Sequence, residues 1–327
     1  MKFSVIVVSY NTLELLRSCL QSLEEADEII VVDNASSDGS PEMVSKEFPW
    51  AILIANSKNV GFGAANNLGL SAMSGDVALF LNSDAQATPG AINRLKQVMS
   101  DPQLVACGGR LVELEDWQSP GIARGQNPLG CNGALNNRTQ NSCSSQLTLW
   151  VVFCEQSGLE KIFPKSRLLS PYWMTERILR SGELVTKVGQ VMGACLAIRP
   201  LEKFDERYFL YVEDTDLCKR LASHGDIVYV ADALFGHVLG GSSAQNRWWS
   251  VAMYNLGKET YFRIHKGRFS AGLCWLLNRC GAALRLVLWS ALALVTLGRV
   301  ARFRRQAELF LRVLLCPTKG PQLPADS

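Results

Sequence analysis

The sequence has few of the residues that build structural metal sites or disulfide frameworks. It contains only three histidines, and its ten cysteines are scattered, with no CxxC pair and no Cys/His spacing typical of a zinc site. No secretory signal precedes the first apolar run, which begins directly after Met1-Lys2. We therefore expect reduced thiols and a cytosolic location.

Two glycine-rich phosphate-binding loops are also missing. No GxxxxGK[ST] stretch occurs, which argues against a P-loop kinase or ATPase. Gly61-Phe62-Gly63 resembles the start of a dinucleotide fingerprint, but it follows the third apolar run. Asn66 stands where GxGxxG requires its last glycine, so this fingerprint is not met.

The charge is small in total and uneven along the chain. The 327 residues are 48% hydrophobic, which is enough for one substantial core plus an appendage, and the net charge is +3. Eleven of the 33 Lys and Arg lie from Arg263 to the end, where only Glu308 and Asp326 oppose them. These basic residues are interleaved with Leu, Val and Trp, a pattern that favours a membrane surface over nucleic acid.

Four short apolar runs alternate with helical patterns in about the first hundred residues. The runs are rich in β-branched residues and are Phe3 to Tyr10, Glu28 to Val32, Trp50 to Ala55 and Val77 to Leu81. This alternation predicts a parallel, doubly wound α/β sheet.

Polar residues or glycines follow each of the four predicted strands. They are Ser9-Tyr10-Asn11, Asp33-Asn34, Asn59 with Gly61, and Asn82-Ser83-Asp84. By itself, Asn82-Ser83-Asp84 fits a turn before a helix better than a ligand site. The ends of parallel strands share one edge of a sheet, however, so the four groups together predict a nucleotide-sized pocket. A carboxylate at such an edge can hold Mg²⁺ or Mn²⁺ against phosphate oxygens.

A second acidic cluster and one histidine are further candidates. Glu213, Asp214 and Asp216 fall in the first turn of a predicted helix, where they either complement the helix dipole or include a general base. Aromatic residues precede the cluster, and their proximity would raise a carboxyl pKa. His237 lies in a glycine-flanked stretch, where it either completes a metal shell or is incidental.

The middle and the end of the chain are less regular. Residues 113–188 read as an irregular insert that is either an acceptor-recognition region or a surface elaboration, with helices over 147–163 and 172–179. We predict a strand over 189–199, a main domain over 1–265 and a membrane-associating tail over 266–327.

The tail is apolar but interrupted. Its longest run without a charged residue, Leu286 to Gly298, has 13 residues, short of the roughly 20 that a spanning helix needs. We expect a helix in the membrane interface or a re-entrant hairpin; a buried core helix is the alternative.

Five ordered motifs resemble the inverting family-2 glycosyltransferases, and most closely the bacterial rhamnosyltransferase-type members of cell-surface polysaccharide (O-antigen or exopolysaccharide) assembly. They are Val8-Ser9-Tyr10-Asn11, Val32-Asp33-Asn34-Ala35-Ser36, Asn59-Val60-Gly61-Phe62-Gly63, Leu81-Asn82-Ser83-Asp84 and Glu213-Asp214-Thr215-Asp216-Leu217. The resemblance implies a GT-A-type, mostly parallel doubly wound sheet with a C-terminal helical appendage, a nucleoside-diphosphate sugar donor, inversion and a divalent cation, Mg²⁺ or Mn²⁺.

The resemblance also implies roles at the donor site. Asp33 would contact the donor base, Ser9 and Asn11 would line the nucleotide site, and Asn59 and Gly61 would border it.

Metal and acceptor roles follow in the same way. Asn82-Ser83-Asp84 takes the place of the family's Asp-x-Asp, so Asp84 would bind the metal together with His237. Because Asn82 stands where the family has its first Asp, this site has one carboxylate fewer. Asp214 would be the general base, with Glu213 as the alternative base and Asp216 in support.

The expected partners are the donor, a glycan or polyprenyl-diphosphate-linked acceptor and an anionic membrane surface, but no nucleic acid. The resemblance suggests dTDP-L-rhamnose as donor and a peripheral position on the cytoplasmic face of the inner membrane. Two alternatives stay open: a catalytically inactive family member that serves as a membrane-associated binding subunit, and a sugar nucleotidyltransferase. The latter usually has a glycine-rich basic loop after its first strand, and Ser9-Tyr10-Asn11-Thr12 has none.

Overall fold

The computed structural model describes residues 1–113, 139–238 and 246–317, and the chain divides into two compact units. The sheet unit comprises Met1–Gln146, Trp173–Phe209 and Glu213–Ser242. The helical unit comprises Leu147–Tyr172, Leu210–Val212 and Ser243–Ser327. The helical unit thus begins well before residue 266 and takes in part of the predicted insert. The division into a glycosyltransferase-like domain over 1–265 and a membrane-associating tail over 266–327 stays a prediction.

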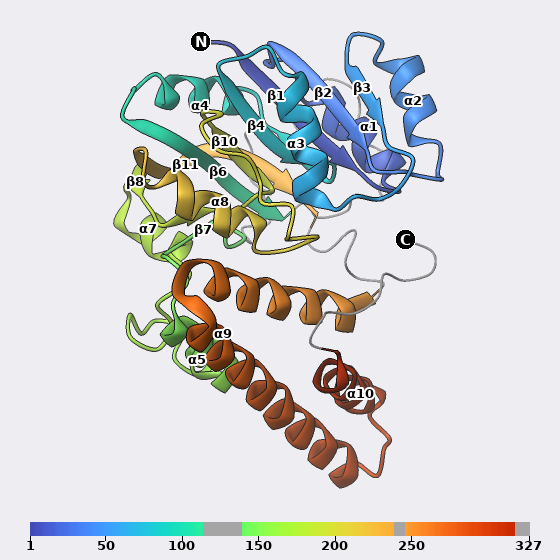
Figure 1. Ribbon diagram of the computed structural model, residues 1–327, viewed down its shortest axis with the longest axis vertical. Coiled ribbons are helices and arrows are strands. Elements are labelled where there is room, and N and C mark those ends of the chain that lie inside the picture. Colours follow the sequence, from blue (N-terminus) through green and yellow to red (C-terminus); the bar gives the residue numbers. More distant parts are fainter. Residues whose placement is uncertain (114–138, 239–245, 318–327) are drawn as a thin grey trace. The chain divides into compact units, whose positions relative to one another are not determined.

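The sheet unit is built on one large mixed sheet. Its strands in the described residues are β1 (Phe3–Ser9), β2 (Glu28–Asp33), β3 (Ile52–Ala55), β4 (Val77–Asn82), β5 (Ala85–Ala87), β6 (Leu104–Glu113), β8 (Val185–Lys187), β10 (Cys195–Ile198) and β11 (Asp226–His237). They run in the order β3-β2-β1-β4-β10-β6-β11-β5, with β8 paired to β11 (Figure 1). A second ladder joins β7 (Cys143–Ser144) to β9 (Gln190–Val191).

The first four strands of the predicted sheet pair in parallel, as predicted: β1 pairs with β2 and β4, and β2 pairs with β3. The central strands β1 and β4 are fully or almost fully buried, because helices cover both faces of the sheet and apolar side chains suit both sides. Antiparallel pairs join β10 to β4 and β6, and β11 to β5 and β8. The strand predicted over 189–199 is two short strands, β9 and β10, separated by residues 192–194.

Helices flank the sheet on both faces. The sheet unit contains α1 (Leu13–Gln21), α2 (Ser40–Glu47), α3 (Phe62–Ala72), α4 (Ala91–Met99), α7 (Thr175–Ser181) and α8 (Glu213–Leu221). One core joins β1 and β4 to α1 and α4 through Val5, Leu79 and Leu95. The other joins the opposite sheet face to α3 and α8 and includes Phe80 and Leu217. The sheet is therefore doubly wound, as expected.

The helical unit contains α5 (Leu149–Ser157), α6 (Leu159–Ile162), α9 (Arg247–Val295) and α10 (Ala301–Leu315). Helix α9 forms two arms that meet at Gly267, whose φ of 83° and ψ of 175° are not helical (Figure 1). Helix α10 packs against α9 after a connection over residues 296–300. In the described part of the chain, α9 alone is long and apolar enough to cross a membrane by length and composition.

The predicted helices of the insert are confirmed as α5, α6 and α7. Residues 114–138 of the predicted irregular insert lie outside the described residues.

Candidate active site

Three polar strand ends meet at one edge of the sheet. Ser9 at the end of β1 pairs in register with Asp33 at the end of β2, and Val8 pairs with Asn82 at the end of β4. The predicted convergence is therefore confirmed for these strands. It follows from their parallel direction and matched lengths.

Asp33 offers one carboxylate oxygen for an external donor. The residue is 2% exposed, and its Oδ2 accepts the Ser36 backbone N–H at 2.9 Å. Its Oδ1 is buried and has no hydrogen-bond partner. Because a buried acceptor without a donor is costly, a ligand N–H or O–H at this position would gain a strong interaction.

A chain of hydroxyl groups connects two of these strand ends. Ser9 Oγ and Thr12 Oγ1 lie 3.0 Å apart, and Thr12 donates to Ser83 Oγ at 2.9 Å. Ser9 is fully buried, so its hydroxyl supports the loops from within. Thr12 was not singled out in the sequence, although its position after the first strand could have suggested it.

Asn11 ties the loop after β1 to the loop after β2. Its Oδ1 accepts the Ser37 backbone N–H at 2.8 Å, and its own N–H donates to Ser36 Oγ at 2.9 Å. Its φ of 51° lies in the left-handed region, which asparagine tolerates better than most residues. Asn11 thereby shapes the loop that surrounds Asp33.

Asn34 organises the segment that contains Asn59 and Gly61. Its Nδ2 donates to Asn59 Oδ1 at 2.9 Å, and its Oδ1 accepts the Val60 N–H at 3.1 Å. Asn59 Oδ1 also accepts the Gly61 N–H at 3.0 Å. Both residues stand near the strand ends as predicted, but these contacts are those of a scaffold within the protein.

Asp84 and His237 are distant in the sequence and lie next to each other in the structure. His237, at the end of β11, places Nε2 3.2 Å from Asp84 Oδ1 and 3.3 Å from Asn82 Nδ2. The strand pairing explains this proximity, because His237 pairs with Ala85 of β5 immediately after Asp84.

Gln140 fixes the orientation of His237 on its other side. The Nδ1 of His237 lies 2.7 Å from Gln140 Oε1, and Gln140 Nε2 donates to the His237 carbonyl at 2.9 Å. When Nδ1–H donates to Gln140, the lone pair of Nε2 faces Asp84, which is the arrangement that metal-ligating histidines require. Gln140 belongs to the irregular insert, and no pattern in the sequence marked it.

The residues present fit a divalent cation held by few protein ligands. The described residues contain no group of three or more His, Cys, Asp or Glu that could hold a metal. Asp84 and His237 would contribute one oxygen and one nitrogen. Mg²⁺ and related ions commonly keep waters and substrate phosphates in the remaining positions, so two protein ligands suffice for a site shared with a diphosphate.

Glu213 and Asp214 form a buried carboxyl pair at the start of α8. Asp214 Oδ2 accepts the Gly193 N–H at 2.8 Å, and its Oδ1 accepts the Thr215 N–H at 2.7 Å. Glu213 Oε2 is buried and has no hydrogen-bond partner. The pair thus has donors aimed at one carboxylate and an unpartnered oxygen on the other.

The two environments separate the roles of the pair. Burial, together with the neighbouring Asp214, raises the pKa of Glu213 to about 8. Burial also raises the pKa of Asp214, but the N–H groups of Gly193 and Thr215 oppose that rise. The N–H donors at Asp214 favour its charged form, whereas Glu213 lacks such donors, so Asp214 is the carboxylate of the pair whose negative charge the protein stabilises more.

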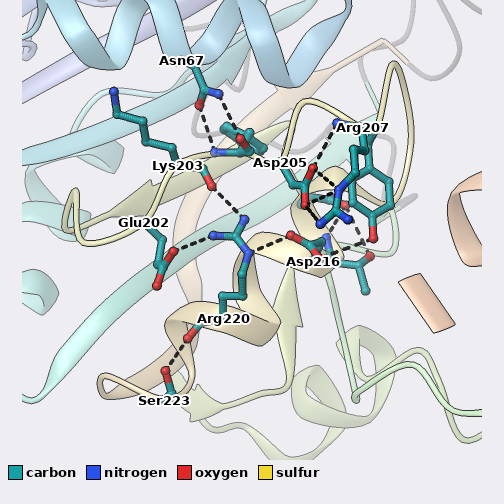
Figure 2. A network of polar contacts seen from close by, with 12 residues as sticks. Asn67, Glu202, Lys203, Asp205, Arg207, Asp216, Arg220 and Ser223 are labelled. Atoms are coloured by element: carbon teal, nitrogen blue, oxygen red, sulfur yellow. Dashed lines mark hydrogen bonds and ion pairs between the residues drawn. The ribbon is translucent and has the colours of Figure 1, made fainter. Parts of the chain in front are cut away.

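Asp216 supports the helix that carries the pair. It is fully buried and accepts from Arg220 Nε at 2.8 Å, and Arg220 also donates to Glu202 and to the Lys203 carbonyl, both at 2.7 Å (Figure 2). Tyr208 donates to Asp216 at 3.3 Å. Asp216 is thus paired with a cation and engaged in holding α8 in place.

Residues 193–194 link the carboxyl pair to the Asp84 side of the site. Gly193 donates its N–H to Asp214, and the carbonyl of the next residue, Ala194, accepts the Asn82 N–H at 3.2 Å. A Cβ on Gly193 would lie 3.3 Å from the Cβ of Asp214, so glycine allows this close approach. The small residues at 193 and 194 were visible in the sequence, but their role was not.

Comparison with known proteins agrees with this geometry. Residues 4–150 match the family model described as Glycosyl transferase family 2. The chain is 29% identical over 298 residues to N-acetylglucosaminyl-diphospho-decaprenol L-rhamnosyltransferase from Mycobacterium tuberculosis, covering 84% of this chain and 88% of that protein. It is 31% identical over 120 residues to the putative glycosyltransferase EpsH from Bacillus subtilis, covering 35% of each.

Among solved structures, the mannosyltransferase PcManGT from Pyrobaculum calidifontis, in complex with GDP-Man and Mn²⁺, is similar at 15% identity. That comparison has a TM-score of 0.49 and covers 96% of this chain and 85% of the other. The family match covers the segments that contain Asp33 and Asp84, and the relative aligns over most of both chains; together they lead to one assignment. Residues 4–150 form a glycosyl transferase family 2 domain, and the protein is a glycosyltransferase with a mixed, mostly parallel sheet.

Proposed function

We propose that this glycosyltransferase moves a sugar, with inversion, from a nucleoside-diphosphate donor to a hydroxyl of a lipid-linked saccharide. The observation that carries the proposal is the placement of three different groups in one region of the sheet unit. Asp33 offers an acceptor, Asp84 with His237 offers a cation site, and Asp214 offers a buried carboxylate.

At the donor end, the protein would recognise the base and hold the diphosphate. Asp33 Oδ1 would accept an N–H of the donor base, which supplies the missing partner of this oxygen. Asp84 and His237 would hold Mg²⁺ or Mn²⁺, and the imidazole ligand favours Mn²⁺. When bound, the cation would supply positive charge that stabilises the departing nucleoside diphosphate.

At the acceptor end, Asp214 would act as the general base. It takes the proton of the acceptor hydroxyl as that oxygen attacks the anomeric carbon from the face opposite the leaving diphosphate. The backbone donors at Asp214 orient its carboxylate, and the protonated Glu213 beside it adds no second negative charge. No protein nucleophile is needed, so one displacement inverts the configuration.

The sugar and the acceptor are proposed from the relatives. The name of the Mycobacterium tuberculosis relative specifies L-rhamnose and an N-acetylglucosaminyl-diphospho-decaprenol acceptor. By that similarity we propose dTDP-L-rhamnose as donor, a polyprenyl-diphosphate-linked saccharide as acceptor and work at the cytoplasmic face of the inner membrane, in assembly of a cell-surface polysaccharide.

The test is a panel of nucleotide sugars with a synthetic prenyl-diphosphate acceptor and Mn²⁺. We expect one donor to release its nucleoside diphosphate, and the product anomer, assigned by NMR, to be inverted. Asp214→Asn should lower kcat by about 10²-fold or more, because general-base catalysis is lost. Its donor affinity, measured by calorimetry, should stay within about twofold of the parent's. No diphosphate release from any donor would refute transfer, and full activity of Asp214→Asn would refute the assigned base.

A further inference from the structure

The second arm of α9 carries a continuous apolar stripe on its outward face. Six large side chains along it are exposed by 36% to 79%: Phe269, Leu273, Leu276, Leu284, Val287 and Leu294. Successive members are separated by whole numbers of helical turns, to within a residue, so they share one side of the helix. We call this surface the α9 stripe.

Two arginines, Arg279 and Arg285, lie within the apolar sequence of this arm, but their charged groups are turned away from the α9 stripe and bind other helices of the unit. Arg279 donates to the carbonyls of Val313 at 3.0 Å and Cys316 at 2.7 Å, at the end of α10. Arg285 donates to the Glu155 carbonyl at 2.7 Å, on α5. Both guanidinium groups thus serve the interior of the helical unit. The 13-residue run without a charged residue, Leu286 to Gly298, is therefore shorter than the apolar surface that the arm presents.

Basic side chains flank the stripe at both ends. Exposed Lys266 and Arg268 precede it, and a group of exposed arginines follows it. That group is Arg299, Arg302, Arg304 and Arg305. Glu308 is the one acidic residue between positions 260 and 317. Positive charge beside an apolar helix face is complementary to anionic phospholipid headgroups above acyl chains.

The inward face of the same arm determines how it would meet a membrane. Asn278 is 2% exposed; it donates to Glu259 at 2.9 Å and accepts from Gln156 at 3.2 Å. An arm that crossed the bilayer would carry this polar network to hydrocarbon depth, where polar groups are expensive. An arm that lies in the interface leaves it within the protein.

We propose that the α9 stripe is a monotopic binding surface for an anionic bilayer, with its flanking basic residues on the headgroups. Two copies of the chain facing each other through the stripe would bring their arginine groups together, and like charges disfavour that arrangement. The proposal concerns lipid binding and does not depend on the sugar transferred.

The test is flotation of the full chain with vesicles containing about 30% phosphatidylglycerol, against vesicles of phosphatidylcholine alone. We expect Leu284→Glu to lower the partition coefficient about tenfold or more, because a charge replaces a membrane-buried leucine. Leu201→Glu is the matched control: Leu201 lies in the sheet unit and is 51% exposed, against 54% for Leu284. It should bind as the parent does.

A second variant isolates the electrostatic part. Arg302→Gln, Arg304→Gln and Arg305→Gln together should weaken binding to anionic vesicles by about fivefold per arginine at low salt. Equal vesicle binding by the parent and Leu284→Glu would overturn the proposal, as would equal losses in Leu284→Glu and Leu201→Glu. A dimer in light scattering that only Leu284→Glu dissociates, with unchanged flotation, would assign the stripe to self-association instead. Because no donor or acceptor is present, these outcomes are separate from those of the transfer assay.

Discussion

Gln140 shows how one residue outside every recognisable motif can control a site. Its Oε1 lies 2.7 Å from Nδ1 of His237 and thereby directs Nε2 toward Asp84. We predict that Gln140→Leu weakens Mn²⁺ binding about 10- to 100-fold, because orienting partners of metal-bound histidines contribute that much affinity. Titration calorimetry or Mn²⁺ electron paramagnetic resonance, with donor present, measures this directly.

The conservative change at the same position is the control. Gln140→Glu keeps an acceptor for Nδ1–H and should retain most of the affinity. Equal Mn²⁺ binding by Gln140→Leu and the parent would remove Gln140 from the site.

Glu213 makes the stability of the protein depend on pH. Its folded-state pKa is raised to about 8 from an ordinary value of 4.5, with burial as the main cause. A group whose pKa is raised on folding contributes its full stability at a pH below its pKa in the unfolded chain. That contribution is lost as the pH rises through its pKa in the folded protein. Between about pH 4.5 and 8 the parent should lose stability for this reason.

Glu213→Gln removes that titration. We predict that this variant is more stable than the parent at pH 8 by about 1–3 kcal/mol and no more stable at pH 5. Thermal unfolding at the two pH values measures the difference, with Glu42→Gln, an exposed glutamate on α2, as control. A variant that gains nothing at pH 8 would contradict the raised pKa of Glu213.

At the scale of elements, Gly61 is where the turn into α3 passes Phe209. Its φ is 89°, and an added Cβ would lie 2.5 Å from the Phe209 carbonyl oxygen, which accepts the Phe62 N–H. We predict that Gly61→Ala lowers the stability by about 2–4 kcal/mol, because strain and a backbone clash add. Gly158→Ala is the control, since Gly158 has a φ of 78° and open space around it.

That control should lower the stability by only about 1 kcal/mol, the cost of the backbone conformation alone. Thermal unfolding of both variants gives the comparison. Equal losses would show that the contact with Phe209 adds nothing.

Much of the sheet and its polar edge could be predicted from local patterns. Strand composition and the spacing of Ser9, Asp33 and Asn82 sufficed, because parallel strands place their ends together. The direction of β10 could not be predicted, since hydrophobic periodicity is the same in parallel and antiparallel strands. The sequence did not mark Gln140, because its partner His237 is distant in sequence. It did not mark the contact of Thr12 with Ser83 for the same reason.

The role of Asn59 shows a different limit. Its residue type and position at a strand end fit a ligand contact, whereas the structure uses its amide oxygen twice within the protein. A motif identifies which residues matter, but only the hydrogen-bond partners distinguish a binding residue from a scaffold residue.

At the scale of the whole molecule, the helical unit depends on a buried ion pair between separate chain segments. Lys258 of α9 is fully buried, and its Nζ lies 2.9 Å from both carboxylate oxygens of Glu155 on α5. We predict that Glu155→Gln destabilises this unit by about 3–5 kcal/mol, because it leaves a buried ammonium without a counter-charge. Hydrogen exchange of α5 and α9 should report the loss, while the sheet unit keeps its protection.

Exchange that is unchanged in α5 and α9 would show that the pair contributes no net stability. Glu160→Gln, on the neighbouring α6, is the control for a change of charge in the same region.

Segments from three places in the chain make up the helical unit: Leu147–Tyr172, Leu210–Val212 and Ser243–Ser327. The helical unit is therefore not formed by the C-terminal segment alone. A reporter fused to residues 243–327 alone would carry Lys258 without Glu155, and a protein shortened before Asn278 would leave Gln156 of α5 without its hydrogen bond to Asn278. To move this unit to another enzyme, all three segments would have to be transferred together. We therefore expect that homologues rarely exchange it by recombination that replaces only a C-terminal segment.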